Sequence, residues 1–300
     1  MSFAAPVVTY GRMIRFSHSI FALPFALSGA ALAAAASGIS VEQIGWIVLA
    51  MVAARSAAMG FNRLVDREID AANPRTAKRE MPAGVLSPLA VWPFVILSAL
   101  CLVFAAWKLN PLCLALSPVA LFVVGGYSFT KRFTWASHLV LGLGLGLAPL
   151  GAWVAVTGRF DVVPVLLGLA VLSWVAGFDI LYSCQDHEYD QGAGLHSIPV
   201  RFGLSGAMNL ARVLHVATVG FMVCVGFAAM LGWIYFAGVA AITLLLLWEH
   251  RLVTPDDLTK VNMAFMTANS IISVAYFIFT LADLWLLSDA TLWAPPIGTP

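Results

Sequence analysis

Nine stretches of the chain are apolar and long enough to cross a lipid bilayer, and they limit the fold more than any other feature. A helix needs roughly 17 to 25 such residues to span the hydrocarbon core. The nine candidates lie near residues 17–37, 43–62, 89–107, 111–129, 137–157, 162–183, 209–230, 232–249 and 268–287. Only 10% of the 300 residues are charged, against about 25% in soluble domains. The sequence therefore predicts an all-α polytopic membrane protein, a single domain over residues 1–300 with nine transmembrane helices.

The distribution of Lys and Arg predicts the side of the membrane that each loop faces. If the N-terminus and the loops after spans two, four, six and eight share one side, that side collects 14 of the 16 Lys and Arg residues, counting Arg55 and Arg212 within the adjoining spans. Cytoplasmic loops are the ones enriched in these residues. We therefore expect a multi-pass protein of the cytoplasmic (inner) membrane, with a cytoplasmic N-terminus, an uncleaved first helix and cytoplasmic caps at about 63–88 and 184–208.

The net charge of +1 bears on partners, because the basic residues are matched locally by acids. A nucleic-acid-binding surface needs a concentrated basic excess. The expected surroundings are therefore the lipid bilayer, with no nucleic acid as partner.

A densely charged segment follows the second apolar stretch. Within it Asn62, Asp66 and Asp70 recur every four residues, a step that drifts only about 40° around a helix, so the three side chains share one face. Pro74 then ends the helix, because it has no N–H and disfavours helical geometry at the residue before it. The cations that follow at once are Arg75, Lys78 and Arg79.

A similar pattern recurs about 120 residues later, after the sixth span. Tyr182, Asp186 and Asp190 again stand four residues apart, and both patterns precede a segment with Pro, Gly and Arg. This faint repeat predicts two helical half-bundles that face each other across one site. Asp179 lies two turns before Asp186 inside the span, where an ionisable group is costly and is a functional candidate by default.

Carboxylates in two such pairs can bind Mg²⁺, which uses one or two carboxylates plus the phosphates of a substrate. Two ions would neutralise most of the charge of a diphosphate and stabilise it as a leaving group. The predicted metal ligands are Asp66, Asp70, Asp186 and Asp190. The competing interpretation is a set of solvated helix ends with local ion pairs, and two matched patterns on one side favour the metal site.

Two cations close the fourth span, in the segment from Tyr127 to Arg132. A Lys suits a diphosphate as a point charge, so we expect Lys131 to bind it. A guanidinium pairs bidentately with a carboxylate, so we expect Arg132 to bind the carboxylate of a second substrate. The competing interpretation is the positive-inside signal alone.

From about Arg12 to about Leu287 the chain resembles the UbiA family of intramembrane aromatic prenyltransferases. Asn62, Asp66 and Asp70 are similar to that family's NxxxDxxxD motif. DILYSCQDHEYD is similar to its DxxYxxxDxxxD motif, which carries over Asp179, Tyr182, Asp186 and Asp190. YSFTKRFT resembles the YPxxKR element, which carries over Tyr127, Lys131 and Arg132. RTAKREMPAG resembles RTxxRPLPSG, which carries over Arg75 and Arg79.

The resemblance implies nine helices around a central cavity, Mg²⁺-dependent ionisation of a polyprenyl diphosphate, and attack by an electron-rich aromatic ring on the allylic cation. Arg63 stands where many 4-hydroxybenzoate enzymes have Asp, and the second motif continues with CQD and LHSIP, which places Gln185 and His196 near the acceptor. These segments look most similar to the branch proposed to prenylate 1,4-dihydroxy-6-naphthoate in menaquinone synthesis by the futalosine route. The expected acceptor is therefore this acid or 4-hydroxybenzoate, in menaquinone or ubiquinone biosynthesis.

Two other functions remain open on the sequence. Haem O synthase-like farnesyl transfer belongs to the same family, but the six histidines are scattered and indicate no haem-related pattern. A secondary transporter also fits nine spans with intramembrane carboxylates and a weak repeat. Transport sites, however, usually lie near the midplane, whereas most acids of the two motifs cluster at the expected cytoplasmic helix ends beside Arg and Lys.

Overall fold

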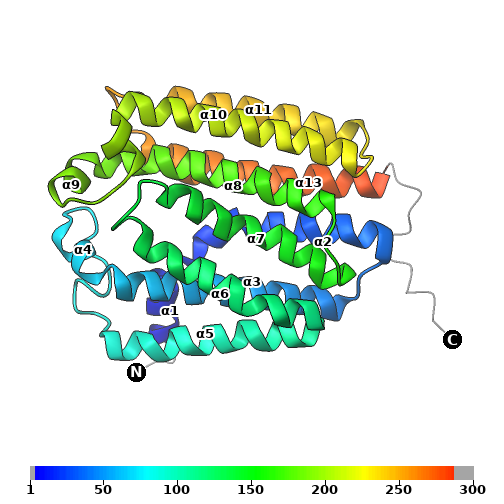
Figure 1. Ribbon diagram of the computed structural model, residues 1–300, viewed down its shortest axis with the longest axis horizontal. Coiled ribbons are helices and arrows are strands. Elements are labelled where there is room, and N and C mark those ends of the chain that lie inside the picture. Colours follow the sequence, from blue (N-terminus) through cyan, green and yellow to red (C-terminus); the bar gives the residue numbers. More distant parts are fainter. Residues whose placement is uncertain (1–3, 287–300) are drawn as a thin grey trace.

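The computed structural model describes residues 4–286, which fold into one bundle of helices (Figure 1). The long helices are α2 (Leu23–Ser37), α3 (Val41–Val65), α5 (Pro88–Leu109), α6 (Pro111–Thr130), α7 (Ser137–Thr157), α8 (Val162–Ser183), α10 (Ile198–Ala228), α11 (Trp233–Leu252) and α13 (Asn269–Leu286). The shorter elements are α1 (Ala4–Met13), η1 (Phe16–Phe21), α4 (Arg67–Ala72), η2 (Cys184–Asp186), α9 (His187–Gly192), α12 (Val261–Met263) and η3 (Ala264–Ala268). Apart from one isolated bridge, the described residues contain no β-structure. The prediction of an all-α membrane protein is confirmed.

Eight helices of the described part are long and apolar enough to cross a membrane. The remaining apolar helix, α2, has 15 residues and falls short of that length. Each predicted span thus coincides with a helix, but the first begins at Leu23 rather than at residue 17. The chain before it is turned away by Arg15, whose φ is 48°, and by the 3₁₀ segment η1. Residue 287 of the ninth predicted span lies outside the described residues.

Helix α8 forms the centre of the bundle. In its apolar stretch 67% of the residues are buried, against 17% in that of α6. Helices α7 and α10 pack against it. Glycines let α7 approach closely: a Cβ on Gly142 would lie 2.3 Å from the carbonyl oxygen of Leu172, and one on Gly146 would lie 2.6 Å from that of Gly168. Small residues permit such backbone contacts between membrane helices. Side chains on α8 are therefore held in fixed positions.

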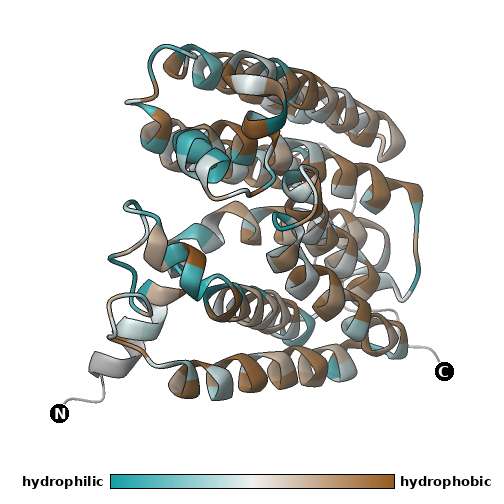
Figure 2. Cartoon of the chain, turned by 60° about the vertical axis from the view of Figure 1, so that its left-hand side comes forward, coloured by the Kyte–Doolittle hydropathy of each residue, from teal (hydrophilic) through white to brown (hydrophobic). Residues whose placement is uncertain are grey.

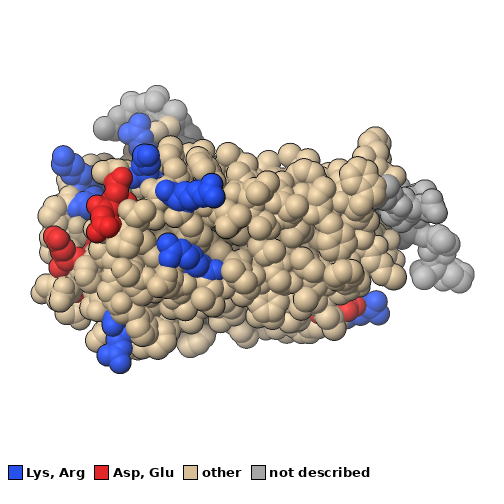
Figure 3. Space-filling model, turned by 90° about the horizontal axis from the view of Figure 1, so that it is seen from above, with Lys and Arg blue, Asp and Glu red and all other residues tan. Residues whose placement is uncertain are grey.

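The polar segments gather at one end of the bundle. The short helices α4 and α9 lie at the same end, although more than 100 residues separate them (Figure 1). Figure 2 shows hydrophilic residues concentrated there and hydrophobic residues along the long helices. Most charged side chains visible in Figure 3 lie at this end as well. The two segments predicted as caps therefore meet on one side of the molecule.

The helix that carries the first aspartate motif is interrupted, which the four-residue spacing did not predict. α3 ends at Val65 and α4 begins at Arg67, with Asp66 at the junction (φ −91°, ψ 6°). The local hydrogen bonds persist, because Asp66 N–H donates to Asn62 O at 2.9 Å and Asp70 N–H donates to Asp66 O at 2.7 Å. The chain bends at Asp66, so Asp66 and Asp70 contact different partners.

Candidate active site

A polar cavity of about 260 Å³ opens between the two aspartate motifs. Its walls come from α3, α4, α6, α7, α8 and α9. All but two of the predicted site residues line it: Asn62, Asp66, Asp70, Arg75, Arg79, Tyr127, Lys131, Asp179, Tyr182, Asp186, Asp190 and His196. The fold thus brings both motifs to one cavity, as the repeat predicted.

Asp66 joins the end of α3 to the end of α6. Its carboxylate accepts a hydrogen bond from Asn62 Nδ2 at 2.9 Å and forms ion pairs with Lys131 Nζ at 2.8 Å and Arg132 Nη2 at 3.1 Å. The residue is only 4% exposed. A buried carboxylate needs such partners, because an unpaired charge in the interior is strongly unfavourable.

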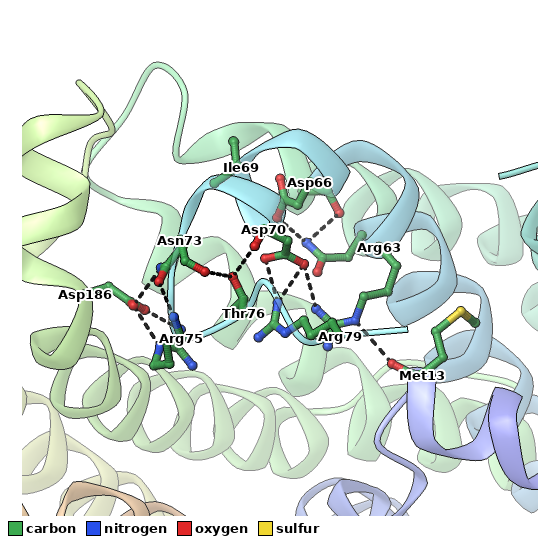
Figure 4. A network of polar contacts seen from close by, with 12 residues as sticks. Met13, Arg63, Asp66, Ile69, Asp70, Asn73, Arg75, Thr76, Arg79 and Asp186 are labelled. Atoms are coloured by element: carbon green, nitrogen blue, oxygen red, sulfur yellow. Dashed lines mark hydrogen bonds and ion pairs between the residues drawn. The ribbon is translucent and has the colours of Figure 1, made fainter. Parts of the chain in front are cut away.

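Asp70 is neutralised by cations from its own segment (Figure 4). Arg79 Nη1 lies 2.7 Å and 2.8 Å from its two oxygens, and Arg63 Nη1 lies 3.5 Å from Oδ2. Arg63 is itself buried and donates from Nε to the carbonyl oxygen of Met13 at 3.2 Å. Arg63, noted in the sequence only as a departure from a benzoate pattern, therefore supports the aspartate motif.

Asp186 connects the two motifs directly (Figure 4). Arg75 donates from Nε to Oδ1 at 2.8 Å and pairs with Oδ2 through Nη2, while Asn73 Nδ2 donates to Oδ1 at 3.0 Å. Arg75 Nη1 also donates to the hydroxyl of Tyr182 at 3.1 Å. Burial alone would lower the pKa of Arg75, but the hydrogen bonds and charge of Asp186 raise this pKa above its ordinary value.

The donor set fits a divalent metal bound together with a phosphate group. Within residues 4–286 no three His, Cys, Asp or Glu side chains form a cluster that would hold a metal by itself. Mg²⁺ seldom uses such a cage and is held by one or two carboxylates plus substrate phosphates. Asp66, Asp70 and Asp186 offer carboxylates around one cavity, with Lys and Arg beside each of them to receive phosphate oxygens.

Two predicted residues lie outside the cavity lining. Arg132 donates from Nη1 to Ser128 O at 2.7 Å and from Nη2 to Val65 O at 2.9 Å, so its guanidinium ties α6 to α3. Gln185 donates to Tyr182 O at 3.1 Å and accepts from Asn262 at 3.4 Å. Arg132 also pairs with the cavity residue Asp66 at 3.1 Å, and contact of either side chain with a substrate stays a prediction. His196 lines the cavity, and its backbone N–H donates to Lys131 O at 2.8 Å.

Several cavity residues escaped the sequence analysis. Asn73 and Arg63 hold aspartates, Arg55 lies deeper in the wall, and His138 contacts Asp179 at 2.7 Å. Arg55 had a usable signal, because it is an ionisable residue within an apolar span and stands seven residues before Asn62 on the same helical face. His138 had none, since nothing local distinguishes it from the other histidines.

A second cavity, of about 230 Å³, adjoins the polar one. Apart from Arg55 and Tyr127, its lining is apolar or small, and it comes from α2, α3, α5, α6 and α7. Residues that line both cavities mark where they meet: Arg55, Met59, Tyr127, Leu141 and Leu145. The molecule thus offers a charged chamber at one end of the bundle that continues into an apolar chamber between the helices.

A helical membrane bundle that joins an aspartate- and arginine-lined cavity to an apolar one defines a membrane-embedded enzyme for a substrate with a charged end and an apolar tail. The chain belongs to the UbiA prenyltransferase family, whose sequence model matches residues 22–271. It is therefore a prenyltransferase, which confirms the resemblance seen in the sequence and removes the transporter alternative.

Individual relatives agree with this assignment. The chain is 31% identical to the 4-hydroxybenzoate octaprenyltransferase of Photobacterium profundum over 225 residues, which cover 74% of this chain and 77% of that protein. It is 34% identical to the mitochondrial 4-hydroxybenzoate polyprenyltransferase of Arabidopsis thaliana over 196 residues, which cover 65% of this chain and 48% of the relative.

Solved structures share the fold. The apo structure of a UbiA homolog from Aeropyrum pernix K1 matches with a TM-score of 0.77 and 31% identity, over 89% of this chain and 97% of that one. A UbiA homolog from Archaeoglobus fulgidus, bound to DMAPP and Mg²⁺, matches with a TM-score of 0.73 and 21% identity, over 93% of this chain and all of that one.

Proposed function

We propose that this protein transfers a polyprenyl group from its diphosphate to an aromatic carboxylic acid, with Mg²⁺ as cofactor. The site would open to the cytoplasmic side of the cytoplasmic membrane, and the product would serve quinone biosynthesis. The observation that carries the proposal is the junction of the polar and apolar cavities at Arg55 and Tyr127. A polyprenyl diphosphate has the same division, with a charged head and a long apolar tail.

The diphosphate belongs in the polar cavity. Asp66, Asp70, Asp186 and Asp190 would hold Mg²⁺, which when bound neutralises the leaving diphosphate. The cations that now pair with these carboxylates, namely Lys131, Arg79 and Arg75, would turn to phosphate oxygens. Charge-assisted hydrogen bonds of this kind are among the strongest in proteins, so the exchange of partners keeps every charge paired.

The isoprenoid tail belongs in the apolar cavity. That cavity extends from the level of Arg55 to the opposite ends of α6 and α7, at Cys113 and Ala155. Its alanines, leucines and methionines offer no hydrogen bonds that a hydrocarbon would leave unsatisfied. Burial there removes the tail from water at about 25 cal/mol per Å² of apolar surface.

Arg55 is the candidate for the acceptor's carboxylate, in place of Arg132. It lines both cavities, and its hydrogen bond within the described part is to the carbonyl oxygen of Arg15 at 3.2 Å. Its Nε is buried without a hydrogen-bond partner among the described residues. A guanidinium pairs bidentately with a carboxylate, and a buried cation without a carboxylate partner gains most from one.

Of the two candidate acids, we propose 1,4-dihydroxy-6-naphthoate as the preferred acceptor and 4-hydroxybenzoate as a poorer one. The support is the sequence around both aspartate motifs, including Arg63 and the CQD and LHSIP segments. A site shaped for two fused rings leaves a gap around one ring, which forfeits dispersion contacts and misplaces the reacting carbon. The expected discrimination is about 10- to 200-fold in kcat/KM.

The test is a direct competition. Purified protein is incubated with geranylgeranyl diphosphate, Mg²⁺ and both acids at equal concentration, and the products are identified by mass. We expect prenylated dihydroxynaphthoate to dominate and all product to vanish when EDTA replaces Mg²⁺. A mixture dominated by prenylated 4-hydroxybenzoate would reverse the choice of acceptor. Absence of any prenylated acid would refute the proposed function.

A further inference from the structure

His138 of α7 and Asp179 of α8 form a pair in the wall of the polar cavity. Their Nδ1 and Oδ2 atoms lie 2.7 Å apart, and the two side chains are 6% and 23% exposed. Both residues line the cavity that also contains Arg55 and Tyr127. The His138 side chain is therefore buried, while the Asp179 carboxylate is partly exposed to the cavity in which the acceptor would lie.

The hydrogen bonds define which atom carries the proton. The backbone N–H of Ile198 lies 3.4 Å from His138 Nε2 and can only donate, so Nε2 is the acceptor. In the neutral ring the other nitrogen, Nδ1, then carries the hydrogen and donates it to Asp179 Oδ2. No described side chain donates to the second oxygen, Oδ1. Asp179 is thus an oriented carboxylate with one oxygen left to accept a proton.

The position of Asp179 separates it from the other carboxylates of the cavity. Asp66, Asp70 and Asp186 each contact a Lys or Arg, whereas Asp179 contacts an imidazole. Asp179 also precedes Asp186 by seven residues, about 10 Å along a helix. Asp179 therefore lies deeper than the charged mouth, on the side where the two cavities meet.

We propose that Asp179 is the catalytic base that removes the ring proton of the aromatic acceptor, and that His138 is its positioning residue. The inference rests on the proposed function. The C–O bond of the prenyl diphosphate breaks, and its electron pair leaves with the diphosphate. The acceptor's ring carbon bonds to the allylic carbon. The C–H bond of that ring carbon then breaks, its proton passes to Asp179 Oδ1, and its electron pair restores the aromatic ring.

The decisive experiment measures a kinetic isotope effect with acceptor deuterated at the reacting ring carbon. We expect ionisation to limit the rate of the wild-type enzyme and therefore an isotope effect near unity. Asp179→Asn cannot accept the proton, and we expect turnover to fall by about 100-fold or more, the range of general-base contributions. Proton loss then becomes slow, and the isotope effect rises well above unity. Release of diphosphate without acceptor reports ionisation alone, and we expect it to fall far less than turnover.

His138 provides the matched pair of variants. His138→Asn keeps an N–H donor near the position of Nδ1 and should retain most of the turnover. His138→Leu removes the donor, and we expect about a tenfold loss together with a raised isotope effect. A purely structural role would lower stability and turnover in both variants without moving the isotope effect.

Three results would overturn the assignment of the base: wild-type turnover by Asp179→Asn, a fall in turnover with an isotope effect of unity, or an equal loss of acceptor-independent diphosphate release. Each is separable from failure of the proposed function, in which the wild-type enzyme itself prenylates neither acid. That result would overturn both.

Discussion

Asp66 and Asp70 of the first motif are 4% and 5% exposed, whereas Asp186 and Asp190 of the second are partly open to solvent. Arg63 and Arg79 pair with Asp70, and Lys131 at the end of α6 pairs with Asp66. Asp186 takes its cation, Arg75, from the first half, and no ion pair of Asp190 is found within residues 4–286. The two motifs thus have equal spacing in the sequence but different surroundings. The aspartates of the first motif are buried and paired with cations, whereas Asp186 of the second motif depends on a cation from the segment that follows the first motif.

The largest expected effect concerns the diphosphate site that the two motifs would share. Under the proposed function, Asp66→Ala and Asp186→Ala should each lower turnover by at least about 100-fold at limiting Mg²⁺, because either change removes a carboxylate that would hold the metal at the leaving diphosphate. Glu68→Ala is the matched control, since its side chain lies in the same charged segment but is 89% exposed. The measurement is the initial rate of prenylated product. Near-normal turnover by one aspartate variant would show that only one half acts on the diphosphate.

The next expected effect is a difference between the two motifs in how much each contributes to the free energy of unfolding. Asp70→Ala leaves the buried Arg63 without its carboxylate, and breaking a buried pair costs roughly 3–5 kcal/mol. Asp190→Ala removes a partly buried carboxylate for which no pairing cation is found among the described residues, and it should stay within about 1 kcal/mol. Denaturant unfolding of both variants in one detergent measures the difference in the free energy of unfolding. Equal losses would mean that the two motifs are equally built into the fold.

The smallest expected effect concerns two arginines near the first motif, Arg55 and Arg132. Arg55→Lys should raise the apparent KM for the aromatic acid by about tenfold, because a Lys cannot pair bidentately with a carboxylate. Arg132→Lys should change that KM less, since Arg132 is not among the residues that line the cavity and is held by Ser128 O, Val65 O and Asp66. Steady-state kinetics with the prenyl diphosphate saturating compare the two. A larger effect for Arg132→Lys would restore the carboxylate role that the sequence suggested for it.

Hydropathy and spacing predicted the features that depend on neighbouring residues. The apolar stretches predicted the helices, and the four-residue spacing predicted that Asn62 and Asp66 share one face, where they form a hydrogen bond of 2.9 Å. The break at Asp66 was not predicted, because the same spacing fits one continuous helix as well as two helices that meet at Asp66. The link from Asn73 to Asp186 spans 113 positions and exists only once the bundle has formed.

The same limit explains what the sequence missed in the site. His138 and Asp179 lie on neighbouring helices, and only the close packing of α7 on α8 brings their atoms within 2.7 Å. Arg132 shows the reverse case, since the sequence suggested that it binds the acceptor's carboxylate, yet its guanidinium bonds to backbone oxygens of α6 and α3 and pairs with Asp66. Both adjacent cations at this helix end pair with Asp66, yet only Lys131 is among the residues that line the cavity, and sequence order alone does not tell which one does.

The ion pairs of Asp66, Asp70 and Asp186 have a consequence for the order of events under the proposed function. A divalent cation that arrives alone must displace Lys131, Arg79 or Arg75 from its carboxylate and leave that cation unmatched. A diphosphate that arrives with it supplies the new partner, so each ligand raises the affinity for the other by the same factor. This positive linkage keeps the affinity for free metal low and links tight metal binding to the presence of the isoprenoid substrate.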